Sequence, residues 1–193
     1  MYSVEDYLKV PSTHIELLAG RILIAVPFYN DPFFNRSVVL LTEYDAQNCV
    51  GLMLTKKSLY TMRDLLPNVK VNRLLHFGGP VVEKMILAIH NYDKSPKYTK
   101  LLPGIYTGFD HELLSIMERN EIQGLHFKFF VGYSGWGPGQ LDEEMRHNMW
   151  VVGHATPELI FATPPEKIWE SAVLNLGEEY KHWLHIPENL SHN

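Results

Sequence analysis

Apolar residues fall into two kinds of segment along the chain, and the two kinds predict different elements. Short runs rich in β-branched and aromatic residues, bounded by Gly, Pro, Asn or Asp, are typical of strands. The strands predicted in this way cover residues 20–28, 36–44, 49–55, 74–81, 84–91, 125–133 and 149–153. Because only the turns "NDPFFN" and "DAQN" separate the first three, we expect the sheet to begin as an antiparallel meander.

Segments with apolar residues at helical spacing predict helices around these strands. They cover residues 3–18, 59–67, 110–120, 140–148 and 163–177. Asp110 is the expected N-cap of the third helix. Thr163 and Glu166 have capping-box spacing at the start of the last helix, and Pro164 suits its first position. Gly177 suits a left-handed residue at the end of that helix.

The order of the elements favours an α+β fold. Strands come first and helices are then mixed with hairpins and with a polar loop at 91–104. The regular β–α–β alternation of a doubly wound fold is therefore missing. A chain of 193 residues is long enough for one sizeable core. We expect a single domain over 1–193, with an N-terminal helical extension at 1–17 and a tail at 188–193.

The composition is that of a globular protein, with 46% apolar and 20% charged residues. A net charge of −5 argues against broad phosphate binding, so we do not expect direct binding of nucleic acid. Cys49 is the only cysteine, which excludes an intrachain disulfide and suits a small core residue. We find neither a signal peptide nor a membrane-spanning run, and therefore expect a soluble cytoplasmic protein.

The most conspicuous motif is "GYSGWGPGQLDEE" (132–144), and it fails three templates for chemistry. Pro138 stands where a phosphate-binding Walker A loop needs lysine. Asp142 stands where the dinucleotide fingerprint needs its third glycine, and Trp136 where a nucleophile elbow needs its second. We interpret the motif as a strand-to-helix turn whose glycines provide positive φ or close backbone approach. Its exposed amides could hold an anion ahead of the helix.

Other residues admit a chemical role beside a structural one. His182 and His185, three apart among ten histidines, could share a helix face and bind a metal, although scattered histidines usually do not. The acids Asp142, Glu143 and Glu144 suit a solvated first helical turn, with proton transfer as the alternative. The tryptophans are expected to be core or half-buried anchors rather than a stacking platform; they are Trp136, Trp150, Trp169 and Trp183.

Three turn segments expose backbone near strand ends and together could form one groove: "NDPFF" (30–34), "FGGPV" (77–81) and the glycine motif. The candidate groove residues are Asp31, Phe34, Gly78, Gly79, Pro80, Ser134, Gly135, Trp136, Gln140 and Glu144. We assign no catalytic residue, no metal ligand and no cofactor.

Four segments in fixed order carry a resemblance to a known family: "GRILIAVPFYNDPFFNRSVVLLTEY", "GLMLTK", "HFGGPV" and "GYSGWGPGQLDEEMRHNMW". Over about residues 18–187 the chain resembles the YqgE/AlgH family, also labelled UPF0301 or DUF179. The resemblance implies a bacterial cytoplasmic protein with one α+β domain. Its bifurcated, mostly antiparallel sheet would fold into a pseudo-barrel with flanking helices. The family supplies no catalytic residues and no cofactor, and the AlgH name suggests transcriptional regulation of alginate production.

The chain departs from the family pattern at two strand ends. Tyr44 follows Glu43 where many relatives have a histidine. Thr55-Lys56-Lys57 stands where many have an Asn-[Lys/Arg]-Pro turn. A mechanism that needs that histidine is therefore not expected in this chain.

These observations lead to a principal functional hypothesis and two alternatives. The first is a non-enzymatic binding or regulatory protein that acts through a protein or small-molecule partner, with at most an indirect role in transcription. The second is a hydrolase or transferase with Ser134, Asp31 and Glu144 in a shared pocket. The third is a metal site at His182 and His185.

Overall fold

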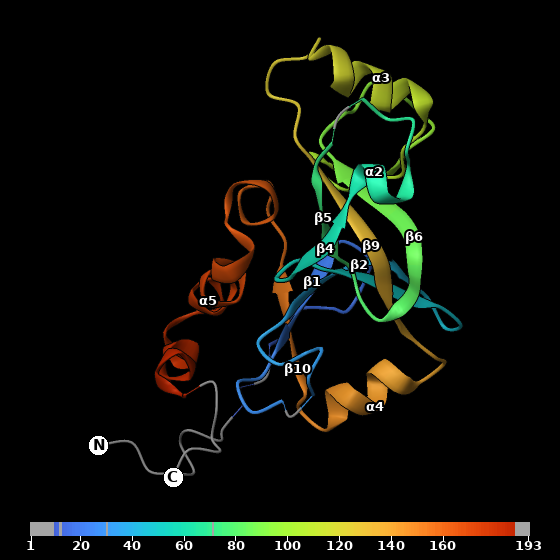
Figure 1. Cartoon of the computed structure of the whole chain (residues 1–193). Coiled ribbons are helices and arrows are strands. Elements are labelled where there is room, and N and C mark those ends of the chain that lie inside the picture. The colour runs from blue at the N-terminus through green and yellow to red at the C-terminus, as the bar shows by residue number, and fades with distance from the viewer. Residues whose placement is uncertain (1–9, 12, 30, 71, 188–193) are drawn as a thin grey trace.

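The computed structural model describes residues 10–11, 13–29, 31–70 and 72–187. A curled, mostly antiparallel sheet forms the body of the molecule, and helices lie on its outer faces (Figure 1). The strands are β1 (Arg21–Ala25), β2 (Val38–Tyr44), β3 (Cys49–Met53), β4 (Lys57–Thr61), β5 (Leu74–Phe77), β6 (Val81–His90), β7 (Thr99–Leu102), β8 (Ile105–Thr107), β9 (Phe127–Trp136) and β10 (Trp150–His154). The α-helices are α2 (Met62–Leu65), α3 (His111–Arg119), α4 (Gln140–Arg146) and α5 (Pro165–Leu176); η1 (Glu158–Ala162) is a π-helix and η2 (Glu178–His185) a 3-10 helix.

The long strand β9 is where the sheet divides. Its C-terminal residues pair with β3, where Ser134 lies opposite Gly51. Its N-terminal residues pair with β6 on one side and with β5 on the other, where His76 lies opposite Phe130. The β5–β9 pair is parallel, and the other strand pairs of the described residues are antiparallel. The expected α+β fold with a bifurcated, mostly antiparallel sheet is confirmed.

Alternate residues of a strand face different helices, because successive side chains of a pleated strand point to opposite sides. On β1, Ile22 and Ile24 pack into the core covered by α5, η1 and η2. Leu23 and Ala25 pack into a second cluster that includes residues of α4. A third apolar cluster joins α2 and α3 to β9 at the far end of the sheet (Figure 1). Within these described ranges, no helix combines the length and apolar composition needed to cross a bilayer.

Two helix predictions are wrong in part. Residues 10–11 and 13–18 are not helical, and the rest of the predicted helix at 3–18 lies outside the described residues. The predicted helix at 59–67 begins as strand, because Leu59 and Tyr60 belong to β4, which pairs with β5. The side chain of Leu59 is 97% exposed, so its helical spacing marks no buried face.

One of the two predicted helix starts is confirmed, and the other is wrong. The N-cap of α3 is confirmed, since the Leu113 amide donates to Asp110 Oδ1 at 3.0 Å. The capping box before α5 is wrong: the helix starts one residue later, and the Thr163 hydroxyl donates to the Glu158 carbonyl at 3.3 Å. Thr163 is instead the C-cap of the π-helix η1, which immediately precedes α5. The predicted loop at 91–104 also contains β7, which pairs with β8.

The glycine motif is a strand-to-helix corner, as predicted, but the strand runs three residues further into it than the predicted end at residue 133. β9 continues to Trp136, and only residues 137–139 connect it to α4. The glycines of the motif and of "FGGPV" serve the predicted close approach of two backbones: a Cβ on Gly78 would overlap the carbonyl oxygen of Gly132. Gly132 itself has φ of 69°, a left-handed conformation that glycine adopts without strain.

We predict that Gly78→Ala lowers the free energy of unfolding by about 3 kcal/mol, because the new methyl group meets backbone that cannot move aside. Gly137→Ala is the matched control, since its Cβ has only Gln140 Oε1 in reach at 3.9 Å and neither glycine has positive φ. Urea denaturation of both variants measures the effect. Equal stability of the two would show that the crossing tolerates a side chain.

Candidate functional site

The three segments expected to form a groove do meet in space. The rings of Phe33 and Phe77 stack with centroids 6.3 Å apart, and those of Phe34 and Trp136 also lie 6.3 Å apart. The Ser134 hydroxyl donates to the Gly78 carbonyl at 3.1 Å. Each segment therefore contacts another through side chains or backbone.

The candidate groove residues differ in how much solvent they reach. Gly78, Gly79, Ser134 and Trp136 are buried; Asp31, Phe34 and Glu144 are half-buried; Pro80, Gly135 and Gln140 are exposed. Much of the contact between the segments is thus interior packing. That the exposed members line a binding groove stays a prediction.

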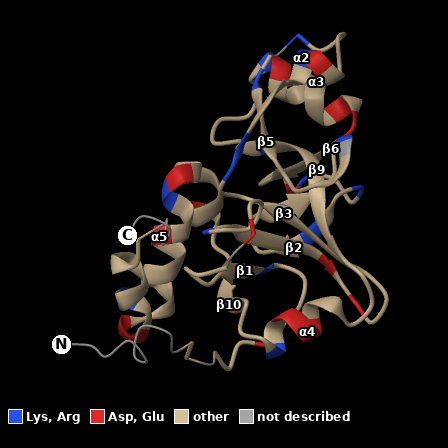
Figure 2. Cartoon of the chain, turned by 60° about the horizontal axis from the view of Figure 1, so that its bottom comes forward, with Lys and Arg blue, Asp and Glu red and all other residues tan. Residues whose placement is uncertain are grey.

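Glu144 on α4 holds the two strands beneath that helix together. Its Oε2 accepts hydrogen bonds from the indole nitrogens of Trp136 at 2.8 Å and of Trp150 at 2.7 Å. Its Oε1 accepts from the Gln140 amide at 3.0 Å. The prediction of a solvated acidic turn therefore holds for Asp142 and Glu143, which are exposed, and is wrong for Glu144. Figure 2 shows acidic residues in red on α4.

Aromatic rings enclose this carboxylate. Tyr29 lies edge-on to Trp150 at 5.2 Å, and Phe34 lies edge-on to Trp150 at 5.5 Å. Burial, followed by the negative charges of Glu144 and Asp31, raises the pKa of Tyr29 to about 12. The four tryptophans are all buried, which confirms their predicted place in the core.

The side chains of the hydrolase hypothesis are engaged in structural contacts. Ser134 has no exposed surface, and its hydroxyl is directed to a backbone carbonyl. Asp31 Oδ1 accepts from the amides of Phe33 at 2.7 Å and Phe34 at 2.9 Å, which fixes the turn. Glu144 is occupied by the indoles. This geometry counts against Ser134 as a nucleophile, because a nucleophile needs an activating base and access to substrate.

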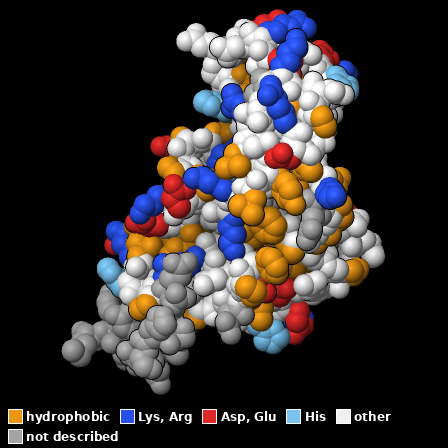
Figure 3. All heavy atoms as spheres, viewed as in Figure 1, with side chains coloured by type: hydrophobic (Ala, Val, Ile, Leu, Met, Phe, Trp, Pro, Cys, Tyr) orange, Lys and Arg blue, Asp and Glu red, His pale blue; other side chains and the backbone are white. Residues whose placement is uncertain are grey.

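A pocket of about 500 Å³ lies between α5 and the sheet. Two of its lining residues, Asn35 and Arg36, directly follow Phe34 in the chain. Its walls come from the β1–β2 loop, the segment after β3, α5 and η2. The lining residues that matter most here are Asn35, Arg36, Thr55, Lys56, Trp169 and Leu184. In Figure 3, Lys and Arg side chains lie between the apolar surface over the strands and the helical side of the molecule.

Three buried polar atoms of this lining have no hydrogen-bond partner among the described residues: Asn35 Oδ1, Arg36 Nε and Thr55 Oγ1. The Arg36 guanidinium lies 4.7 Å from the centroid of the Trp169 ring, and its Nη2 donates to the Ile186 carbonyl. Buried polar groups are rarely left without partners, so three in the residues of one pocket make it the place where a polar ligand or ordered water would supply missing hydrogen bonds.

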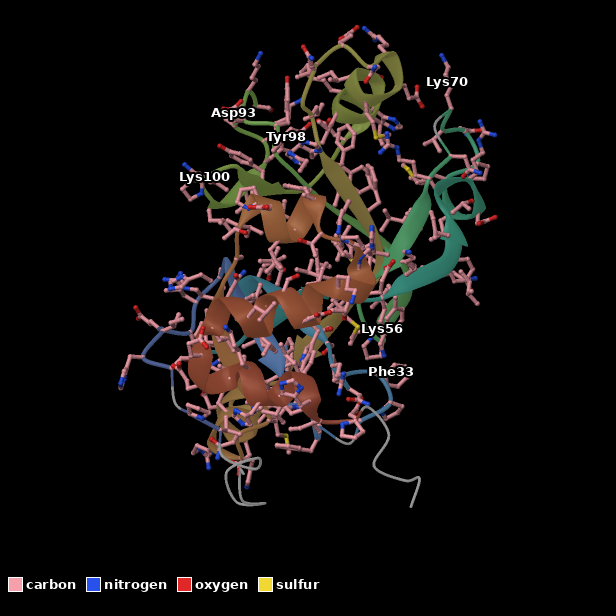
Figure 4. The ribbon with its side chains drawn as sticks, turned by 90° about the vertical axis from the view of Figure 1, so that its left-hand side faces the viewer. Phe33, Lys56, Lys70, Asp93, Tyr98 and Lys100 are labelled. Atoms are coloured by element: carbon pink, nitrogen blue, oxygen red, sulfur yellow. The ribbon has the colours of Figure 1, made fainter. Side chains whose placement is uncertain are left out.

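The acids of the pocket are already paired. Glu166 Oε2 lies 3.3 Å from Lys57 Nζ, and Glu170 Oε2 lies 2.8 Å from Lys167 Nζ. Lys56 donates to the Pro32 carbonyl at 3.0 Å, and Figure 4 shows it beside Phe33 at the margin of α5. No described carboxylate forms an ion pair with Arg36, so its positive charge has no counter-charge among the described residues.

Sequence reasoning did not select these pocket residues. Asn35 ends the turn "NDPFFN" and Arg36 begins the next predicted strand, while Thr55 and Lys56 stand out only as a departure from the family pattern. The distinguishing feature of this segment is structural: Arg36 has a positive φ of 49°, which no sequence pattern reveals. Few non-glycine residues adopt that conformation, and those that do are concentrated at functional sites.

A second hollow, of about 320 Å³, lies between the β2–β3 turn and the start of α4. Its backbone amides are largely satisfied. Asp45 Oδ1 accepts from Gln47 and Asn48 at 2.7 and 2.8 Å, and the Gly137 amide donates to Gln140 Oε1 at 3.1 Å. These contacts weaken the idea that the glycine motif holds an anion through its amides.

The proposed metal pair lies on η2, where residues three apart share a face. Within the part of the chain that the structure describes, no group of three or more His, Cys, Asp and Glu side chains is placed to hold a metal ion.

We predict that Glu144→Ala lowers the free energy of unfolding by about 2–4 kcal/mol, because two buried indole N–H groups lose their acceptor. Glu143→Ala on the same helix removes only exposed contacts with Arg146 and His147 and should change stability by about 0.5 kcal/mol or less. Thermal and chemical denaturation measure both. A Glu144→Ala protein as stable as the control would contradict the structural role of this carboxylate.

We predict that Cys49 resists labelling in the native protein. Burial, with smaller contributions from Asp142 and Glu144, raises the pKa of its thiol to about 12. At pH 8 the native thiolate fraction is then about a thousandfold lower than that of an unperturbed thiol. Reaction with a colorimetric disulfide reagent should be correspondingly slow until denaturant is added. Prompt native labelling would refute the buried placement.

Known proteins resemble this chain over nearly its whole length. The family model described as AlgH-like (DUF179) matches residues 22–181. A UPF0301 protein of Parabacteroides distasonis is 34% identical over 200 residues, covering 98% of each chain, and one of Bacteroides fragilis is 30% identical over 187 residues, covering 95% of each.

Two solved structures share the fold. A crystal structure of a Corynebacterium diphtheriae protein aligns with a TM-score of 0.75 at 20% identity, covering 95% of this chain and 98% of that one. The solution structure of the AlgH protein from Pseudomonas aeruginosa aligns with a TM-score of 0.70 at 25% identity, covering 87% and 93%. The chain therefore belongs to the AlgH-like UPF0301 family.

Proposed function

We propose that this protein is a binding or regulatory protein rather than an enzyme, and that the pocket between α5 and the sheet takes a small acidic ligand. The observation that carries the proposal is the set of three buried, unpartnered polar atoms on Asn35, Arg36 and Thr55. The side chains of the rival hydrolase hypothesis are engaged in fixing the fold.

The chemistry of the lining favours a carboxylate or phosphate group attached to an apolar body. Arg36 offers a charged N–H donor, and such donors form their strongest hydrogen bonds with anionic oxygens. Thr55 adds a hydroxyl that can donate to the same group. Trp169 and Leu184 provide an apolar wall for the remainder of the ligand.

Binding at Arg36 provides a means of regulation, because the same guanidinium holds the C-terminal segment. It stacks on Trp169 of α5 and donates to the Ile186 carbonyl just after η2. A ligand that draws Arg36 toward itself competes with these contacts and loosens the segment. Such a change suits recognition by a protein partner in the cytoplasm, and with a net charge of −5 any role in transcription would be indirect.

We predict saturable binding of at least one member of a panel of small carboxylates and phosphates, followed at constant ionic strength through the NMR signal of the Trp169 indole N–H. Arg36→Lys should weaken it about tenfold or more, because lysine lacks the planar donor edge. Thr55→Val should weaken it to a smaller extent.

Arg119→Lys is the matched control, because Arg119 forms an exposed ion pair with Glu121 at 3.1 Å far from the pocket. It should leave the affinity unchanged. If no panel member binds, or if Arg36→Lys binds as the control does, the pocket is not an acidic-ligand site.

A further inference from the structure

A lysine and a histidine with buried, unpartnered nitrogen atoms lie on neighbouring strands, outside the pocket lining. Lys128 on β9 is 9% exposed, and its Nζ is buried without a hydrogen-bond partner among the described residues. His76 on β5 is half-buried, and its Nδ1 is likewise buried and unpartnered in the part of the chain that is described.

The two side chains face the same side of the sheet. His76 lies opposite Phe130 in the parallel β5–β9 pair, and their rings are 5.4 Å apart. Lys128 precedes Phe130 by two residues on the same strand, so the pleat points both in one direction. Lys57 extends the row, because it lies opposite His76 in the β4–β5 pair.

No described negative charge accompanies His76 and Lys128 where they are buried, and Lys57 beside them is also positive. Burial is the largest influence on His76, followed by the positive charges of Lys128 and then Lys57, and it lowers the pKa of the imidazole to about 4. Burial alone lowers the pKa of Lys128 to about 8. The carboxylate of Glu166 pairs with Lys57 at the exposed end, and no described acid forms an ion pair with Lys128.

An ammonium group buried without a counter-charge is strongly unfavourable, and proteins normally pair it or bind it to a ligand. We propose that Lys128 and His76 bind one small oxyanion, a carboxylate or a sulfate- or phosphate-like group, on the face of the β5–β9 pair that also carries Phe130. The ammonium supplies the charge, and the imidazole supplies a directional N–H at Nδ1. The site is independent of the proposed pocket ligand, since neither residue lines that pocket.

The test follows the lysine amine and the imidazole directly in the full-length protein by NMR, with isotope-labelled lysine and histidine. Sodium sulfate and sodium malonate are the probes, and sodium chloride keeps ionic strength constant. Sulfate stays fully ionised over the pH range used, so any pH dependence belongs to the protein. We expect sulfate or malonate to raise the pKa of Lys128 by about one unit or more, which corresponds to about tenfold stronger binding to the protonated form.

The sign of the pH dependence is fixed by this linkage. Below about pH 8 the free lysine is already charged and affinity is insensitive to its titration. Above that pH the free protein loses the proton, so affinity should fall by up to about tenfold per pH unit. Binding should also raise the pKa of His76, because an adjacent anion favours the imidazolium.

Lys128→Met removes the charge while keeping an unbranched side chain, and Lys100→Met, at an exposed position of β7, is the matched control (Figure 4). We expect Lys128→Met to weaken sulfate binding at least about tenfold and Lys100→Met to leave it unchanged. Should Lys128→Met fail to fold, the wild-type titration still decides the question. Absence of any shift at Lys128 and His76 with both probes beyond that caused by chloride would overturn the proposal, whatever happens at Arg36.

Discussion

The close crossing of two backbones at Gly78–Gly79 and Gly132–Ser134 is the constraint on which the rest of the structure depends. Side chains at Gly78 or Gly79 would overlap backbone atoms of residues 132–134. Because the chains touch here, β5 can lie beside β9 in parallel while β3 occupies the later part of the same strand. The division of the sheet at β9 lies at this contact, and β5 and β6 beyond it provide residues of the third apolar cluster.

The crossing also explains which parts of the fold could be predicted from the sequence. Strand segments and the Asp110 cap are specified by neighbouring residues, and these predictions are confirmed. The extension of β9 into the glycine motif is not predicted, because the partner backbone comes from residues 78–79, more than fifty positions away. The sequence does not distinguish a glycine that allows close contact with a distant backbone from one that allows a local turn. Similarly, Leu59 was assigned to a helix because its pairing with β5 is not local information.

The candidate site was still harder to predict, because its defining property is the lack of partners. Three adjacent acids look alike in the sequence, but only Glu144 meets two indole donors, one from β9 and one from β10. Arg36 is held by Trp169 and by the Ile186 carbonyl, 150 residues away. Nothing in the apolar segments around Thr55 and Lys128 predicts that their polar atoms are buried. Only the folded chain shows that these atoms are buried and have no hydrogen-bond partner among the described residues.

Net charge is a poor guide to such sites. The chain carries −5, which argues against a broad phosphate-binding face, yet Arg36 and Lys128 carry positive charge on buried atoms without hydrogen-bond partners among the described residues. The two statements are compatible because they concern different distances. Exposed charges farther than about 8 Å from a ligand are largely screened at physiological salt, whereas a buried charge in direct contact is screened little. An acidic surface therefore disfavours polyanions that touch many places at once, and leaves a single small oxyanion free to bind where the local charge is positive.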